Sequence, residues 1–243
     1  MKVLLKLWSY VYNFLNSIAD NFYQSVIYDN RYQFILEGLF HTILIAFFAV
    51  IIGIILGLII TIIRDYNAKC GKLKILSKLA KWYVDIIRGT PVILQLMIIY
   101  YVIFKSVDIN IVIVGIIAFG LNSSAYVSEI IRGGLNSIPK GQIEAGYSLG
   151  FQYGSIMKYI VLPQTIKTIL PGLGNEFITL LKETSVGAYI GIIELTKASD
   201  IIASRTYDYF FPLLIIAIIY LIMTLGLSKL VSNLERKFSN DWN

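Results

Sequence analysis

The sequence predicts an all-α integral membrane protein with about five transmembrane helices. Of the 243 residues, 57% are hydrophobic and only 15% are charged, with a mean hydropathy of +0.72. A soluble domain has about 45–50% apolar and about 25% charged residues. Long uncharged runs alternate with short loops rich in Lys and Arg, which is typical of membrane proteins. A single cysteine and a single histidine exclude a disulfide framework and a metal site built from several such ligands.

The uncharged runs locate the spans. Crossing a bilayer core of about 30 Å takes about 20 apolar residues. Runs of 26, 20 and 20 uncharged residues predict spans at about 38–63, 109–131 and 209–231. A run of 16 is long enough only if its helix begins near Trp82, which gives 82–104. The fifth span, 166–193, contains charges that should face protein or water, because charges in lipid are costly.

Residues 1–37 precede the first long apolar run. Apolar side chains from Leu4 to Ile18 recur at helical spacing, which favours an amphipathic helix on the membrane surface. A poorly ordered leader is the alternative. We assign residues 38–232 to the transmembrane domain and 233–243 to a tail.

The distribution of positive charge predicts the orientation. Of the 21 Lys and Arg, 14 lie in residues 64–88, 129–167 and 229–243, against six in the alternating segments. Positive charge marks the cytoplasmic side. We therefore expect a multi-pass protein of the cytoplasmic membrane with its N-terminus outside and its C-terminus inside. Cys70 is then a free thiol in a reducing compartment.

The predicted cytoplasmic loop, residues 132–165, is unusually long. Pro139, Gly150 and Pro163 divide it, since Gly favours a helix end and Pro a helix start or stop. We predict two short helices, 141–149 and 151–161, that meet at a glycine corner. An ordinary amphipathic loop helix with a C-terminal glycine is the simpler alternative.

The loop contains a spaced motif. Glu144-Ala145-Gly146 is followed after three residues by Gly150, and after nine more by Ile160-x-Leu162-Pro163. This pattern resembles the EAA signature of importer-type ABC transporter permeases, with Gly146 in place of the second Ala. Three further segments are similar to the polar amino-acid branch of that family: Arg88-Gly89-Thr90-Pro91-x-x-x-Gln95, Ala125 to Gly134, and Leu181-Lys182-Glu183-Thr184-Ser185.

The resemblance implies a type I ABC importer transmembrane domain. Such a permease pairs with a second copy or a sister chain, and an extracytoplasmic amino-acid-binding protein delivers its substrate. Its EAA loop docks on a cytoplasmic ATPase dimer, which binds ATP and Mg²⁺. Because this sequence contains no phosphate-binding P-loop, we expect a transport subunit rather than an enzyme. Membrane lipid is an expected partner and nucleic acid is not. The candidate coupling residues are Glu144, Ala145, Gly146, Gly150, Ile160, Leu162 and Pro163.

A second hypothesis from another class remains open at this point. An ion-coupled secondary transporter or a channel, independent of ATP, could use Glu129, Glu176, Lys182 and Glu183 as intramembrane charges. The EAA spacing favours the importer, because a secondary carrier needs no coupling helix.

The fifth predicted span suggests a substrate pathway. Glu176, Thr179 and Glu183 are spaced by three and four and so share one helix face, where Gln95 and Asn122 could meet them. Two carboxylates on one face favour a cationic guest, so we predict a basic amino acid such as arginine, lysine or histidine. Glutamine is the second candidate, and a structural pairing of Lys182 with an acid is the alternative explanation of the charges.

Overall fold

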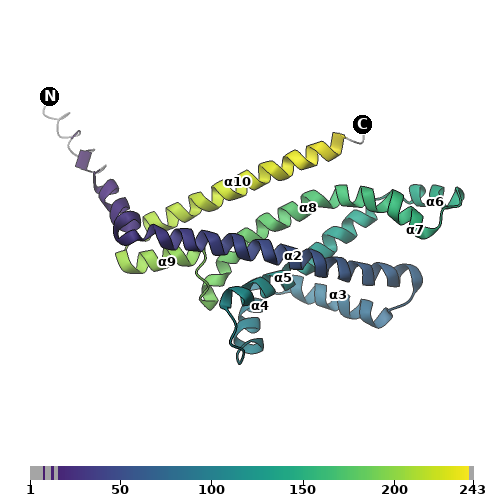
Figure 1. The fold of residues 1–243 in the computed structure, drawn as a ribbon, viewed down its shortest axis with the longest axis horizontal. Helices are drawn as coiled ribbons and strands as arrows, with labels where there is room; N and C mark the ends of the chain where they lie inside the picture. The colour runs from purple at the N-terminus through teal and green to yellow at the C-terminus, as the bar shows by residue number, and fades with distance from the viewer. Residues whose placement is uncertain (1–7, 9–11, 14–15, 241–243) are drawn as a thin grey trace.

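The computed structural model describes residues 8, 12–13 and 16–240, and the side chains as far as residue 237. The described part is an elongated helical bundle without β-strands (Figure 1). The leader helix predicted from Leu4 to Ile18 lies largely outside the described residues. Residues 16–22 are helical and lead into a short π-helix, η1 (Tyr23–Ile27), and a 3₁₀ turn, η2 (Tyr28–Asn30). The other helices are α2 (Tyr32–Cys70), α3 (Lys74–Gly89), α4 (Val92–Ile98), η3 (Ile99–Ile103), α5 (Ile111–Asn136), α6 (Lys140–Ser148), α7 (Tyr153–Ile156), η4 (Met157–Val161), α8 (Leu162–Glu183), η5 (Thr184–Ile190), α9 (Leu195–Thr206) and α10 (Phe210–Asn240).

Helices α2 and α5 form the centre of the bundle. They approach closely because small residues line their contact: a Cβ at Gly53 would lie 2.7 Å from Ser123 Oγ, and one at Gly57 would lie 2.8 Å from Val127 Cγ1. Small residues at helix contacts are the usual solution in membranes, where no hydrophobic effect drives helices together. The main apolar core surrounds this contact and includes Ile45, Phe119 and Leu181.

Three helices of the described chain are long and apolar enough to cross a membrane: α2, α5 and Phe210–Lys237 of α10. Helices α3 and α4–η3 pass the same test only as a pair, and their axes are bent by 112°. Helix α8 spans about 33 Å at 1.5 Å per residue, but it is not apolar enough to belong to this group.

The single helix expected over residues 82–104 is therefore wrong. Pro91 has no N–H to donate, and its ring excludes the residue before it from helical geometry. Thr90 is accordingly extended, with φ −123° and ψ 148°. The chain bends sharply there, so residues 74–103 form a broken helix pair instead of one straight helix.

The segment after α8 also differs from a straight span. It tightens into the 3₁₀ helix η5 and ends at Gly191, whose φ is +96°. The following helix, α9, was not expected from the sequence. This helix packs against α2 and α10.

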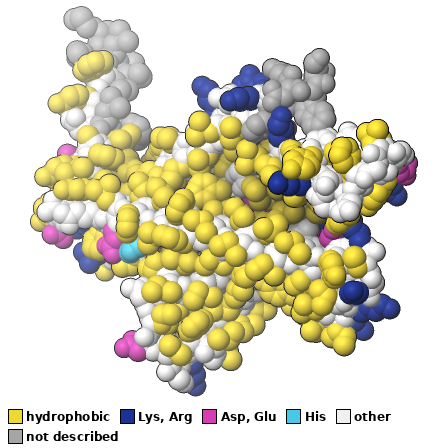
Figure 2. Space-filling model, turned by 45° about the vertical axis from the view of Figure 1, so that its right-hand side comes forward, with side chains coloured by type: hydrophobic (Ala, Val, Ile, Leu, Met, Phe, Trp, Pro, Cys, Tyr) yellow, Lys and Arg dark blue, Asp and Glu magenta, His cyan; other side chains and the backbone are white. Residues whose placement is uncertain are grey.

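The two ends of the bundle are distinct. The end of α2, the start of α3, the α6–α7 region and the end of α10 lie toward the right in Figure 1, and α9 with the start of α10 lies toward the left. Apolar side chains cover most of the face in Figure 2, and most of its Lys and Arg side chains lie in the right half. The segments with the highest density of basic residues therefore share one end.

Candidate functional site

The loop between α5 and α8 forms a compact helix pair. Helix α6 ends in a Schellman motif, in which Phe151 N donates to Gly146 O (3.1 Å) and Gly150 N to Tyr147 O (2.9 Å). Gly150 adopts φ +81°, a left-handed conformation that costs other residues energy. The chain then reverses into α7. The glycine corner and the two flanking helices agree with the prediction from the sequence.

A small apolar cluster holds the pair together. Ile138, Ile156 and Val161 are its buried members. A Cβ at Gly146 would lie 3.0 Å from Ile156 Cγ1 and 3.4 Å from Ile160 Cδ1. Outside the cluster, Gln164 Nε2 of α8 donates to Gln142 Oε1 of α6 at 2.6 Å. The pair is thus joined to α8 by a hydrogen bond as well as by the continuous helical chain.

The structure divides the EAA residues into two groups. Glu144 and Ala145 are exposed, as are Leu162 and Pro163. Gly146 is buried and Ile160 is half-buried, and both face the interior of the pair. Gly146, a candidate coupling residue, therefore faces the interior of the pair, where its lack of a side chain leaves room for Ile156 of the same chain.

Pro163 lies at the start of α8, one of the two positions, helix start or helix stop, that are expected of a proline, but it does not interrupt the helical chain. Residues 153–183 are continuously helical, and Pro163 lies in the first turn of α8. The preceding turn, η4, is a π-helix in which Leu162 N donates to Met157 O. The wider turn accommodates a residue that has no N–H of its own.

The tip of the pair presents apolar side chains to its surroundings. Leu149 is 77% exposed, Tyr147 51% and Phe151 49%. These three residues flank the Gly150 corner, at the end of the molecule farthest from α9 (Figure 1). An exposed apolar patch of this kind indicates an interaction surface.

A polar cluster lies between α5 and α8, at the level of the spans. Glu176 is 9% exposed, and Ser123 Oγ donates to its Oε1 at 2.7 Å. Glu183 is half-buried two turns later, and Thr179 between them is exposed. The shared face of the three residues is therefore only partly enclosed in the single chain.

Gln95 and Asn122 meet each other. Asn122 Nδ2 donates to Gln95 Oε1 at 2.9 Å, which links α4 to α5. Gln95 Nε2 in turn donates to Ile87 O (2.8 Å) and to Thr90 O (3.1 Å). The helix is broken before α4, so these backbone carbonyl groups lack the N–H donors of a continuous helix. The Gln95 side-chain amide donates to them instead. No direct bond to Glu176 is present among the described residues.

The sequence did not indicate the role of two polar residues, Ser123 and Glu129. Ser123 follows Asn122 in an apolar run, and nothing in its spacing indicates a partner for Glu176. Glu129 was a candidate ion-coupling group, but Arg64 Nη1 donates to its Oε1 at 2.6 Å and Arg132 Nε to its Oε2 at 3.0 Å. A carboxylate held between two guanidinium groups has a structural role. No cluster suited to a metal ion is found in the described part of the chain.

Comparison with known proteins decides the family. Residues 68–240 match the family described as "Binding-protein-dependent transport system inner membrane component". The chain belongs to this family. It is therefore the membrane-embedded permease subunit of an ABC-type importer and not an enzyme, and the ATPase of such systems is a separate subunit. The resemblance noted from the EAA motif is confirmed.

Individual relatives agree with this assignment. The "Putative glutamine transport system permease protein GlnP" of Rickettsia typhi is 41% identical over 206 residues, 84% of this chain and 92% of that protein. The "Arginine transport system permease protein ArtQ" of Bacillus subtilis is 40% identical over 211 residues, 86% of this chain and 94% of that protein.

Solved structures give the same result. One, described as "Crystal structure of an amino acid ABC transporter with histidines", has 43% identity and a TM-score of 0.77 over 84% of this chain and 94% of its own. The MetNI methionine ABC transporter, in an inward-facing conformation, shares the fold with a TM-score of 0.67 at 19% identity, over 85% of this chain and 98% of that one.

Proposed function

We propose that this permease imports a basic amino acid, and that Glu176 and Glu183 of α8 give the pathway its preference for positive charge. Membership of the importer family supports the transport role, and the names of its relatives indicate amino acids as the substrate class. The finer assignment depends on one observation: two carboxylates lie on one face of a helix at the level of the spans.

The geometry of α8 supports a cationic guest. The two glutamates are seven residues apart, which is about 10 Å along the helix. Their carboxylates are close enough to interact electrostatically. Turning either toward lipid would cost about 2.5–3.5 kcal/mol or more. Lys182, the cation nearest in sequence, is exposed; it attracts the Glu183 carboxylate but forms no salt bridge within the described residues. A substrate ammonium or guanidinium group would add a positive charge in direct contact with the carboxylates.

The test is transport by Glu176→Gln in the assembled importer. Stimulation of ATP hydrolysis by arginine should fall about tenfold, since a hydrogen bond to a charged group contributes about 1.5–3 kcal/mol. Stimulation by glutamine should change much less. Glu235→Gln, at an exposed carboxylate of α10, is the matched control and should change neither. If glutamine drives the wild-type complex and arginine does not, the basic-substrate assignment is wrong.

Glutamine is the second candidate. Asn122, whose amide bonds Gln95, lies on the helix next to Glu176, and its neighbour Ser123 already donates to that carboxylate. A neutral amide side chain could exchange hydrogen bonds with such groups without any net charge. The same transport measurement separates the two candidates.

We further propose that the α6–α7 pair docks on a cytoplasmic ATPase dimer, with Glu144 and the tip residues Tyr147, Leu149 and Phe151 as the contacts. A second permease chain, either a copy or a sister, completes the translocation unit, and an extracytoplasmic binding protein delivers the substrate. The motif spacing and the exposed tip support the docking role. ATP and Mg²⁺ bind in the partner ATPase, and this chain's contribution is to transmit the movement through α8.

The orientation belongs to the same proposal: a bacterial cytoplasmic membrane, with the N-terminus outside and the C-terminus inside. Cys70 is exposed at the end of α2 and is a natural reporter. A membrane-impermeant maleimide should label it only after permeabilisation. In a Cys70→Ser background, Lys105→Cys and Asp200→Cys should be labelled in intact cells. Labelling of Cys70 in intact cells would reverse the topology.

A further inference from the structure

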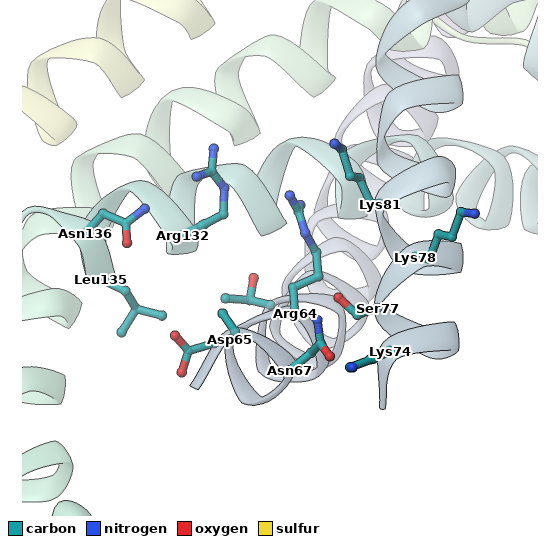
Figure 3. A pocket seen from close by; sticks show the side chains of 12 residues that line it. Arg64, Asp65, Asn67, Lys74, Ser77, Lys78, Lys81, Arg132, Leu135 and Asn136 are labelled. Carbon is teal, nitrogen blue, oxygen red and sulfur yellow. The ribbon is translucent and has the colours of Figure 1, made fainter. Parts of the chain in front are cut away.

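A cavity of about 500 Å³ opens between the end of α2, the first half of α3 and the end of α5. Figure 3 shows the side chains from these three helices arranged around a common space. Arg64 is the first charge after the uncharged run of α2, and Arg132 lies one turn beyond the run of α5. The cavity is therefore at the boundary between the apolar part of the bundle and water. Its lining consists of Thr61, Arg64, Asp65, Asn67, Ala68, Lys74, Ser77, Lys78, Lys81, Arg132, Leu135 and Asn136.

The cavity has an excess of positive charge. Arg64 and Arg132 share one carboxylate, that of Glu129. Asp65, the acid in the lining, is paired with Lys69 Nζ at 2.7 Å. The remaining lining cations are three lysines of α3 on one helix face, and none of them forms a salt bridge within the described chain: Lys74, Lys78 and Lys81. Such a set of side chains suits a phosphate group.

One acceptor in the lining lacks a donor. Asn67 Oδ1 is buried and forms no hydrogen bond. A buried acceptor without a partner costs about 1–3 kcal/mol. A ligand that brings hydroxyl groups as well as a phosphate would satisfy this acceptor.

An apolar hollow adjoins the basic cavity. It has a volume of about 590 Å³ and shares Lys74 with the cavity; its other lining residues are Gly71, Leu73, Ile75, Leu76 and Leu79. The same side of α3 continues as an exposed apolar ridge, with Ile75 80%, Trp82 56% and Ile86 60% exposed. A ligand that fits both spaces has an anionic head and an apolar tail.

We propose that this junction of α2, α3 and α5 binds an anionic phospholipid with a hydroxylated headgroup, such as phosphatidylglycerol. The phosphate lies among Lys74, Lys78 and Lys81, a headgroup hydroxyl donates to Asn67, and the acyl chains follow the α3 ridge. Basic residues at a membrane surface attract anionic lipids. The adjoining apolar hollow favours a lipid over free phosphate, which has no use for it.

The test uses the full chain in nanodiscs with Trp82 as the reporter. The chain has three tryptophans, so Trp8→Phe and Trp242→Phe leave Trp82 alone. Phosphatidylglycerol or phosphatidylcholine with brominated acyl chains is added at equal fractions. Brominated phosphatidylglycerol should quench Trp82 more strongly. Each lysine contributes about fivefold to the preference for phosphatidylglycerol over phosphatidylcholine. The triple variant K74Q/K78Q/K81Q should therefore lower this preference by a factor on the order of 100.

The matched control is K229Q/R236Q/K237Q, which removes as many charges from the end of α10 and should keep the preference. All six positions are exposed, so neither triple variant disturbs the core. As a measurement that needs no variant, raising the salt to about 1 M should weaken the wild-type preference, because the screening length falls to about 3 Å.

Three outcomes would overturn the proposal. Equal quenching by both lipids in the wild type would show no headgroup selection. Loss of the preference on addition of inorganic phosphate at constant ionic strength would indicate a site for the free anion. If the α3 variant keeps its lipid preference but no longer copurifies with its ATPase, the cavity is part of a protein interface.

Discussion

The two ends of the bundle are built in opposite ways. The α6–α7 pair is fastened by a few apolar contacts and exposes its tip, where Leu149 is 77% exposed. At the other end, Glu194 is fully buried at the start of α9, and its carboxylate accepts hydrogen bonds from Thr196 N (2.8 Å), Lys197 N (2.7 Å) and Tyr220 OH (3.3 Å).

One face of helix α2 packs against the chain at residues 193–195 and encloses the α9 end. A Cβ at Gly38 would lie 2.8 Å from the Glu194 backbone, His41 Nδ1 donates to Ile193 O at 2.8 Å, and Thr42 Oγ1 accepts from Leu195 N at 3.3 Å. At the α9 end, the buried polar groups thus find hydrogen-bond partners within the chain. At the α6–α7 end, apolar side chains remain exposed. We infer that one end is complete within the chain and that the other requires a partner.

The largest effect is expected at the buried end. Gly38→Val should cost about 3 kcal/mol or more of the free energy of unfolding, because a rigid backbone leaves no room for the side chain. The folded yield from membranes and the thermal midpoint measure this loss. Gly226→Val in α10 is the control, since nothing lies within 4 Å of a Cβ there. Equal yields of the two variants would contradict the close contact.

At the exposed end, Leu149→Ser should leave the thermal midpoint within about 2 °C and weaken ATPase association about tenfold, because an exposed apolar side chain contributes to binding and not to folding. Gly150→Val should also uncouple transport by straining the φ +81° corner. Gly141→Ala, a helical position with open space, should do neither. If Leu149→Ser and Gly150→Val both copurify normally with the ATPase, the α6–α7 end does not require a partner as inferred.

A pH series distinguishes the two ends further. Burial raises the pKa of Glu194 from its ordinary 4.5 to about 7, although backbone N–H donors oppose the shift. The folded state therefore binds more protons than the unfolded state between these values, and stability falls as the pH rises from about 4.5 to about 7. Glu194→Gln should flatten this slope in thermal melts. A slope that Glu194→Gln leaves unchanged would assign it to another group.

The smallest effect concerns Gly146, where the EAA pattern has alanine. Gly146→Ala should cost less than about 1 kcal/mol, because its Cβ would press on Ile156 at 3.0 Å while alanine favours the helix. Adding Ile156→Val should restore the lost stability in chemical denaturation. If the double variant has a lower free energy of unfolding than Gly146→Ala alone, the two positions are not coupled as described.

The prediction from sequence was most accurate where local chemistry decides the backbone. Gly150 marks a left-handed helix end, and the long uncharged runs mark α2, α5 and α10, because both signals depend on neighbouring residues alone. The EAA spacing likewise indicated the family, since a spaced motif needs no tertiary information.

Long-range contacts account for the errors. Gly146 was one of the candidate coupling residues, but which side of α6 turns inward depends on Ile156, ten residues later. Pro163 does mark the start of α8, but the π-turn that joins this helix to α7 without a break has no sequence signature. Glu129 resembled a functional charge because its partner Arg64 comes from another helix. Helix α9 was missed because a short, mixed segment gains its stability from α2 and α10.

The corner between α3 and α4 has a consequence for the order of events during biogenesis. Helix α3 has 16 residues and is about 24 Å long, too short to cross a bilayer core of about 30 Å unaided. The Gln95 amide seals the corner, and Asn122 fixes that amide from α5, which is synthesised later. The corner therefore cannot reach its final form until the next span has left the ribosome and entered the membrane, so we expect residues 74–103 to wait at the membrane surface or in the insertion machinery for α5.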